Sequence, residues 1–154
     1  MNNSGLRVFL NKLNAANLLF VGIGNVLRRD DGVGVYISQR IRETPTISTL
    51  TVEVSIENYI GKINTLNPDA LILIDCMDLG QPPGTYRIVE IEGVVDLTFN
   101  THNISLNRLN YFFAMPVYIL GIQPERIEFG ESLTSTVQES AGDIISLINQ
   151  KEVC

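Results

Sequence analysis

The sequence predicts an α/β fold: a single domain with a mostly parallel, twisted sheet of about five strands and helices on both faces. Short apolar runs, typical of buried strands, alternate along the chain with stretches in which apolar residues recur every three or four positions. This alternation indicates parallel strands joined by crossover helices. The 154 residues are enough for one such domain, and the chain shows no internal repeat or linker.

Five segments are predicted to be strands. The run 17–23 is short and apolar and stops at a glycine pair, as buried parallel strands do. Apolar and polar residues alternate over 50–54, which indicates a strand. The run 70–74 is the most apolar and is therefore the predicted central strand. Further strands are predicted at 85–91 and 117–122.

Helical spacing of apolar residues appears in the segments around the strands. The predicted helices cover residues 6–13, 31–44, 59–66, 106–113 and 136–149. Thr136 and Glu139 have the spacing of a capping box at the start of the last helix. The first 16 residues precede the first strand and are interpreted as an N-terminal arm, so that the α/β domain itself spans 17–154.

Charge and cysteine content exclude several classes of protein. The 11 basic residues against 17 acidic ones give a formal net charge of −6, and a nucleic-acid partner, which needs a basic face, is not expected. Cys76 and Cys154 are too isolated for a disulfide framework, which indicates a reducing compartment. No apolar stretch has the length of a signal peptide or a membrane span. We therefore expect a cytoplasmic protein without membrane insertion, of a size and charge compatible with a monomer.

Polar residues follow three of the predicted strands, where ligand sites of open α/β sheets lie. Asp30 and Asp31 come after the glycine-rich turn that ends the first strand. Asp75 follows the central strand directly, and His102, the single histidine, comes after the fourth strand. Structural roles stay open for all of them: Asp30 or Asp31 could cap the next helix. Asp75 could tie down a loop through backbone N–H groups, and His102 could be an ordinary surface or core residue.

Asp31, Asp75 and His102 are predicted to converge at one edge of the sheet. Two carboxylate oxygens and one imidazole nitrogen suit a borderline divalent ion such as Ni²⁺ or Zn²⁺ and leave coordination positions open. A nucleotide-binding α/β module is the alternative for this edge. The turn lacks the third glycine of the dinucleotide fingerprint, where Leu27 stands, and two carboxylates there would repel a phosphate.

Four stretches of the chain carry a family resemblance. They are GIGNVLRRDDGVGV (22–35), LILIDCMDLGQPPGTYRI (71–88), THNISLNRL (101–109) and ILGIQPE (119–125). In this order and spacing they resemble the [NiFe]-hydrogenase maturation proteases, and most closely the type that serves hydrogenase 3. The resemblance implies an aspartic-type endopeptidase that removes the C-terminal extension of a hydrogenase large-subunit precursor after nickel has been inserted.

The resemblance also implies roles for individual residues. The family's two metal-contacting carboxylates correspond to Asp31 and Asp75, and its histidine to His102. These three residues are therefore expected to be catalytic and to contact nickel, which the precursor is expected to carry. Water is the expected nucleophile, because Cys76 should point to the opposite face of its strand from Asp75. Two mechanisms stay open: nickel polarises the scissile carbonyl, or the two carboxylates act as an acid/base pair.

A non-catalytic adaptor that senses nickel in the precursor would need the same three residues and stays open as a further alternative. Arg28 and Arg29 are either a solvated pair or a contact with an acidic patch on the precursor. They are more basic than the family's loop commonly is, and the N-terminal arm also departs from the family pattern.

Overall fold

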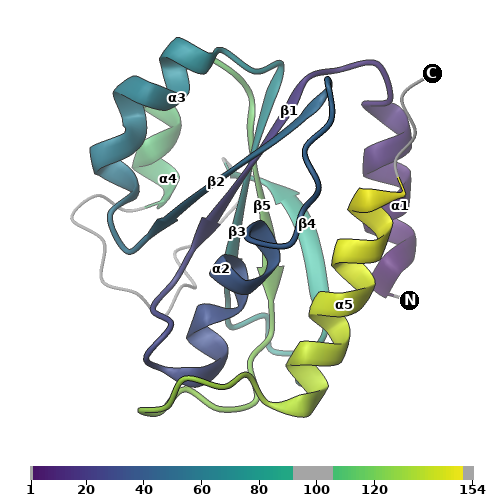
Figure 1. Ribbon diagram of the computed structural model, residues 1–154, viewed down its shortest axis with the longest axis vertical. Coiled ribbons are helices and arrows are strands. Elements are labelled where there is room, and N and C mark those ends of the chain that lie inside the picture. Colours follow the sequence, from purple (N-terminus) through teal and green to yellow (C-terminus); the bar gives the residue numbers. More distant parts are fainter. Residues whose placement is uncertain (1, 92–105, 151–154) are drawn as a thin grey trace.

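The structure, a computed structural model, describes residues 2–91 and 106–150 and confirms a single α/β domain (Figure 1). Its strands are β1 (Leu18–Ile23), β2 (Ile47–Glu53), β3 (Ala70–Cys76), β4 (Tyr86–Glu90) and β5 (Val117–Ile122). They form one five-stranded sheet in the order β2-β1-β3-β5-β4. The first four strands in this order run parallel, and β4 runs antiparallel to β5 at one edge. The predicted central strand is therefore the middle strand of the sheet.

Helices cover both faces of the sheet, as predicted. They are α1 (Asn2–Lys12), η1 (Arg29–Gly32), α2 (Val33–Ser38), η2 (Ile56–Tyr59), α3 (Ile60–Leu66), α4 (Leu106–Leu109), η4 (Asn110–Phe112) and α5 (Ser135–Asn149), where η marks a 3-10 turn. Figure 1 shows α2 and α5 on one side of the sheet and α3 and α4 on the other. No helix within 2–91 and 106–150 is long and apolar enough to cross a membrane.

Alternating side chains of β3 supply the two halves of the hydrophobic core. Ile72 and Ile74 point to the side of α1, α2 and α5, whereas Leu71 and Leu73 point to the side of α3 and α4. All four side chains are fully buried. A central strand covered on both faces needs apolar residues at every position, which explains the uninterrupted apolar run.

The segment expected to be an N-terminal arm contains α1, which packs against α5 and β4. Leu6 and Leu10 of this helix are buried and belong to the same core cluster as Ile72 and Ile144. The helix therefore contributes apolar side chains to the core of the domain.

The helix predicted over 31–44 is shorter than expected, because η1 replaces its first turn and α2 ends at Ser38. Beyond that point the backbone finds hydrogen-bond partners on α5: Arg42 N donates to Asn149 Oδ1 over 2.8 Å. The Arg42 guanidinium also donates to the main-chain oxygen of Asn149 over 2.7 Å. Ile41 is still buried in the core, so its helical spacing reflects burial from a non-helical segment.

The capping box predicted at Thr136 and Glu139 is wrong. α5 begins at Ser135, so Thr136 lies inside the helix, and the N-cap position belongs to Thr134. The side chain of Thr134 makes no capping bond and instead donates a hydrogen bond to Asp30 over 2.8 Å. A tertiary contact therefore decides where this helix begins, which local spacing could not indicate.

The parallel arrangement gathers the loops that follow β1, β3 and β5 at one edge of the sheet, the carboxyl edge. β1 pairs directly with β3, and β3 pairs directly with β5. In Figure 1 this edge lies below the sheet, where the loop between β5 and α5 runs beside the start of α2. Ligand sites of open α/β sheets are found at such an edge.

Candidate active site

Asp31 lies in η1, which packs against β3. Two glycines make this close approach possible. A Cβ atom at Gly34 would collide with the main-chain oxygens of Ile23 and Ile74, at the ends of β1 and β3. A Cβ atom at Gly24, whose φ is 146°, would collide with the main-chain oxygen of Asp31. The glycine-rich turn thus places Asp31 directly at the carboxyl edge. The role of the two glycines is to let backbone segments pack closely.

The Asp31 side chain is fully buried, with an exposed fraction of 0%. Its amide N donates to the main-chain oxygen of Arg28 over 3.1 Å. The guanidinium of Arg28 lies 3.9 Å from Asp31 Oδ2, and the Arg28 side chain is 43% exposed. Arg28 therefore forms the border between the buried carboxylate and the surface.

Asp75 is the second carboxylate at this edge and the penultimate residue of β3. It is fully buried, and its Oδ1 accepts a hydrogen bond from Cys76 N over 2.8 Å. The strand's alternation directs Asp75 toward the face of Leu71 and Leu73, while Cys76 packs with Ile72 and Ile74. The predicted opposite orientation of Asp75 and Cys76 is confirmed.

The Cys76 thiol is buried next to Asp75 in sequence, and its surroundings disfavour the thiolate. Burial raises the pKa of this thiol well above its ordinary value, and the negative charges of Asp75 and Asp31 raise it further. Asp31 lies in η1, which contacts the strand β3 that holds Asp75, so the structure brings these two predicted site residues to one edge of the sheet. A thiol whose pKa is raised in this way stays protonated at neutral pH and is a poor nucleophile.

Asp30 has a different role from its neighbour. The N-cap residue of α2 is Gly32, so neither Asp30 nor Asp31 occupies that position. Asp30 Oδ2 instead accepts hydrogen bonds from the amides of Glu125 and Arg126, over 2.9 and 3.0 Å. Its Oδ1 accepts from Thr134 N over 2.7 Å. The helix-capping interpretation is therefore wrong for Asp30, which ties the loop after β1 to the loop after β5.

The main chain reinforces this tie. Arg29 N donates to Gly130 O over 2.7 Å, and Gly130 N donates to Leu27 O over 2.8 Å. Asp30 N donates to Arg126 O over 3.1 Å. Residues 27–30 and 126–130 thus lie side by side as one hydrogen-bonded unit at the carboxyl edge.

His102, the third predicted site residue, lies outside the described residues. Within 2–91 and 106–150, no group of three His, Cys, Asp or Glu side chains is arranged to hold a metal ion. The nickel-contacting set of Asp31, Asp75 and His102 therefore stays a prediction.

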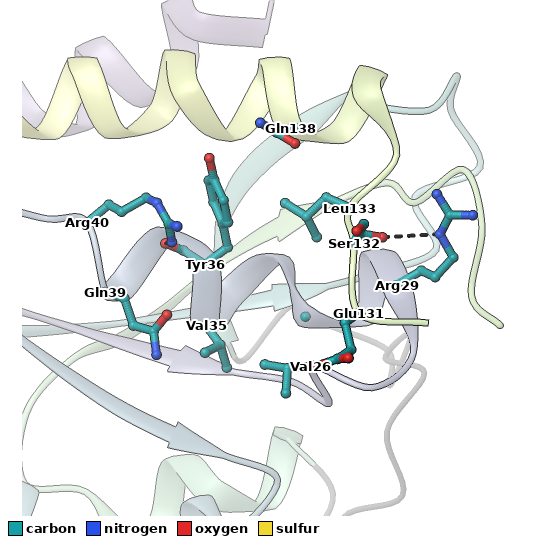
Figure 2. Close-up of a pocket in the computed structure, with 11 residues that line it drawn as sticks. Val26, Arg29, Val35, Tyr36, Gln39, Arg40, Glu131, Ser132, Leu133 and Gln138 are labelled. Carbon is teal, nitrogen blue, oxygen red and sulfur yellow. Dashed lines mark hydrogen bonds between the residues drawn. The ribbon is translucent and has the colours of Figure 1, made fainter. Parts of the chain in front are cut away.

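Two hollows flank the Asp31 turn. A cavity of about 360 Å³ lies between α2 and the start of α5 (Figure 2). On its rim Arg29 Nε donates to Ser132 O over 3.1 Å, and Arg40 stacks on the Tyr36 ring at 3.6 Å. A second hollow of about 520 Å³ lies at the end of β2 and is lined by Val52, Glu53, Val54, Ser55, Asn58 and Tyr59. Glu53, which lines this hollow, accepts a 2.9 Å hydrogen bond at its main-chain oxygen from Gly24 N. The hollow therefore lies beside the glycine-rich turn.

Sequence reasoning missed the contribution of the loop between β5 and α5. Thr134 and the amides of Glu125 and Arg126 hold Asp30 in place. The only sequence signal was the stretch ILGIQPE, which ends within this loop. Residues of this loop contact Asp30, which lies about a hundred positions away in the sequence. Contacts between such distant residues leave no local sequence pattern.

Comparison with known proteins gives a consistent result. The family model for hydrogenase maturation proteases matches residues 54–151. A putative hydrogenase maturation protease of Methanocaldococcus jannaschii is 28% identical over 140 residues, covering 79% of this chain and 81% of that relative. The hydrogenase 3 maturation protease of Escherichia coli is 28% identical over 124 residues, covering 77% and 80%.

The fold agrees as well. The crystal structure of a [NiFe] hydrogenase maturation protease from Thermococcus kodakarensis has a TM-score of 0.82 to this chain at 24% identity, covering 94% of this chain and 97% of that one. The sequence resemblance is thus confirmed, and the family model covers more than half of the chain. The chain belongs to the hydrogenase maturation protease family.

Proposed function

We propose that this protein is the endopeptidase that removes the C-terminal extension of a [NiFe]-hydrogenase large-subunit precursor after nickel insertion. The observation that carries the proposal is the pair of fully buried carboxylates, Asp31 and Asp75, at the carboxyl edge of a sheet with this family's fold. A buried carboxylate is costly to keep unless it is hydrogen-bonded, is paired with a cation or takes part in chemistry. The relatives named as hydrogenase maturation proteases supply the substrate class. The isolated cysteines suit a reducing compartment, and we place the reaction in the cytoplasm.

In this proposal nickel is part of the substrate. Asp31, Asp75 and His102 complete the coordination shell of an ion that the precursor already holds. Oxygen and imidazole ligands suit Ni²⁺, and three of them leave positions for ligands from the precursor. A precursor without nickel would then fail to engage the carboxylates, so that cleavage waits for the metal.

Water is the proposed nucleophile, since the buried Cys76 thiol stays protonated and packs away from Asp75. One carboxylate of the pair takes a proton from the attacking water, and the amide nitrogen of the leaving segment gains a proton when the bond breaks. Stabilisation of the developing oxyanion comes either from the substrate's nickel or from the second carboxyl group in its protonated form. Both routes need Asp31 and Asp75 together.

The test is cleavage of purified precursor, loaded with nickel or free of it, followed by mass spectrometry of its C-terminus. We expect the loaded precursor alone to be cut, and Asp31→Asn, Asp75→Asn and His102→Ala to abolish cutting. Asp78→Asn is the matched control, because Asp78 lies three residues from Asp75 but is exposed. It should cleave like the wild type.

Three outcomes would contradict the proposal. Equal cleavage of both precursor forms would remove the role of nickel. Binding of the loaded precursor without any cleavage would replace the protease by the nickel-sensing adaptor. If Asp78→Asn were as inactive as Asp75→Asn, the loss of cleavage would not be specific to the buried carboxylates Asp31 and Asp75.

A further inference from the structure

Two large apolar side chains are exposed beside the candidate active site. Leu27 is 48% exposed and Phe129 is 86% exposed. We propose that these two residues, the apolar ridge, are the docking point for the folded precursor next to its nickel. The proposal rests on the proposed function and adds the surface by which the protease recognises its substrate.

The backbone places the two residues close to each other. Arg28 and Gly130 form a parallel bridge, and Gly130 N donates to Leu27 O over 2.8 Å. Leu27 and Phe129 immediately precede the two bridged residues, so the backbone of Leu27 lies beside the residue that follows Phe129. The two residues come from the loops after β1 and β5, and both expose apolar side chains at the carboxyl edge.

The ridge is fixed relative to the buried carboxylate. Asp31 is four residues from Leu27, and Arg28 Nη1 lies 3.9 Å from Asp31 Oδ2. Asp30, directly before Asp31, accepts hydrogen bonds from Arg126 N and Thr134 N, on either side of Phe129. One residue thus anchors both the ridge and the site. A contact surface that is already ordered loses little entropy on binding, which favours its use for docking.

The surroundings of the ridge identify a protein as its occupant. Arg28, Arg126 and Glu128 border it, and Arg126 lies 3.5 Å from Glu128. An apolar centre with a border of both charges is typical of protein interfaces, whereas a nucleic acid would need a purely basic border. In the proposed function the precursor brings nickel to Asp31, so it must lie against the edge of the sheet that holds both Asp31 and the ridge. The occupant is therefore the precursor, through an apolar surface beside its metal.

The experiment measures steady-state cleavage of nickel-loaded precursor by wild type, Leu27→Ser, Phe129→Ser and the double variant. We expect the double variant to raise KM about tenfold or more, as loss of an interface anchor does, with kcat within about twofold. Tyr111→Ser is the matched control, because Tyr111 is equally exposed, at 85%, but lies in η4. Its KM should be that of the wild type. Melting temperatures should differ little, since Phe129 and Tyr111 are largely solvated and Leu27 is about half exposed.

The outcomes separate the ridge from the proposed function. An unchanged KM in the double variant would show that the ridge is not the docking point. An equal rise of KM in Tyr111→Ser would show the same. Neither result would contradict the proposed protease activity. Loss of self-association in the double variant would also overturn it, because the occupant would then be a second copy of this chain. If the wild type binds loaded precursor without cutting it, the proposed function fails, and the same variants are compared by Kd. If the wild type neither binds nor cuts, both proposals fail.

Discussion

Asp30 and Thr134 are joined by two hydrogen bonds across 104 positions of sequence. Thr134 N donates to Asp30 Oδ1 over 2.7 Å, and Thr134 Oγ1 donates to Asp30 Oδ2 over 2.8 Å. The first residue precedes Asp31 and the second is the N-cap of α5. The position of the site's first carboxylate is thus coupled to the start of the last helix.

Replacing Asp30 by Asn should therefore damage both stability and catalysis. The amide group of Asn would face backbone N–H donors with a donor of its own. We expect a loss of about 2–4 kcal/mol in the free energy of unfolding, measured by urea denaturation. At a temperature where the variant is folded, kcat should fall because Asp31 shifts. Glu139→Gln, an exposed neutralisation on α5, is the control and should change neither quantity. Wild-type stability of Asp30→Asn would show that the hydrogen bonds to Asp30 do not stabilise the fold.

The glycine at position 34 should not tolerate even a methyl group. A Cβ atom there would collide with main-chain oxygens of β1 and β3, so Gly34→Ala should push α2 off the sheet. The expected loss is about 1–3 kcal/mol, with cleavage strongly reduced. Gly142→Ala is the matched control, since its Cβ atom meets no other residue and it lies within α5. That change should stabilise the protein by about 0.5–1 kcal/mol. Thermal unfolding of the two variants measured together checks the expected loss of stability in Gly34→Ala and the expected gain in Gly142→Ala.

The thiol of Cys76 should make stability fall at alkaline pH. Its pKa in the folded state lies above the ordinary value of 9.0, because burial and then the Asp75 charge disfavour the thiolate. Below pH 9 both states keep the proton; above it only the unfolded state releases it, which favours unfolding. We expect the free energy of unfolding to drop by about 1 kcal/mol more in the wild type than in Cys76→Ala between pH 8.5 and pH 10. Parallel pH profiles for the two proteins would contradict this.

The same Cys76→Ala variant should still cleave the precursor. Because the thiol is protonated and faces away from Asp75, its removal leaves the proposed nucleophile, water, in place. Endpoint mass spectrometry of the precursor is sufficient to check this. Complete loss of cleavage in a folded Cys76→Ala protein would instead indicate covalent catalysis.

Helix α1 should contribute to stability through its buried side only. Leu6→Ala removes a side chain that is 1% exposed and should cost about 2–5 kcal/mol. Val8→Ala changes a residue of the same helix that is 52% exposed and should stay within about 0.5 kcal/mol of the wild type. Urea denaturation distinguishes the two. Equal and small effects would mean that residues 1–16 are a dispensable arm.

The strands could be predicted closely because burial on both faces leaves a strong local pattern. The run 117–122 coincides with β5, and 70–74 lies within β3. The edge position of β4 and its antiparallel direction could not be predicted, since apolar alternation carries no information on strand direction. Asp31 and Asp75 were found because topology alone sends both to the carboxyl edge.

The misjudged features share one physical cause. α2 ends early because Arg42 bonds to Asn149, and the start of α5 is set by Thr134 and Asp30. Asp30 itself binds amides from residues 125–134 and caps no helix. In each case a distant partner replaces the local one that helix rules assume. Local patterns therefore indicate the elements, and contacts between loops decide their ends.

The tie between residues 27–30 and 126–134 also has a consequence for the order of synthesis. A ribosome delivers Asp31 early, but the groups that hold its turn in place belong to the last fifth of the chain. Until Thr134 has left the exit tunnel, the nascent protein has no fixed turn with which to meet a substrate. The turn that carries Asp31 can therefore take its final position only after residues 125–134 have been synthesised and have folded against it.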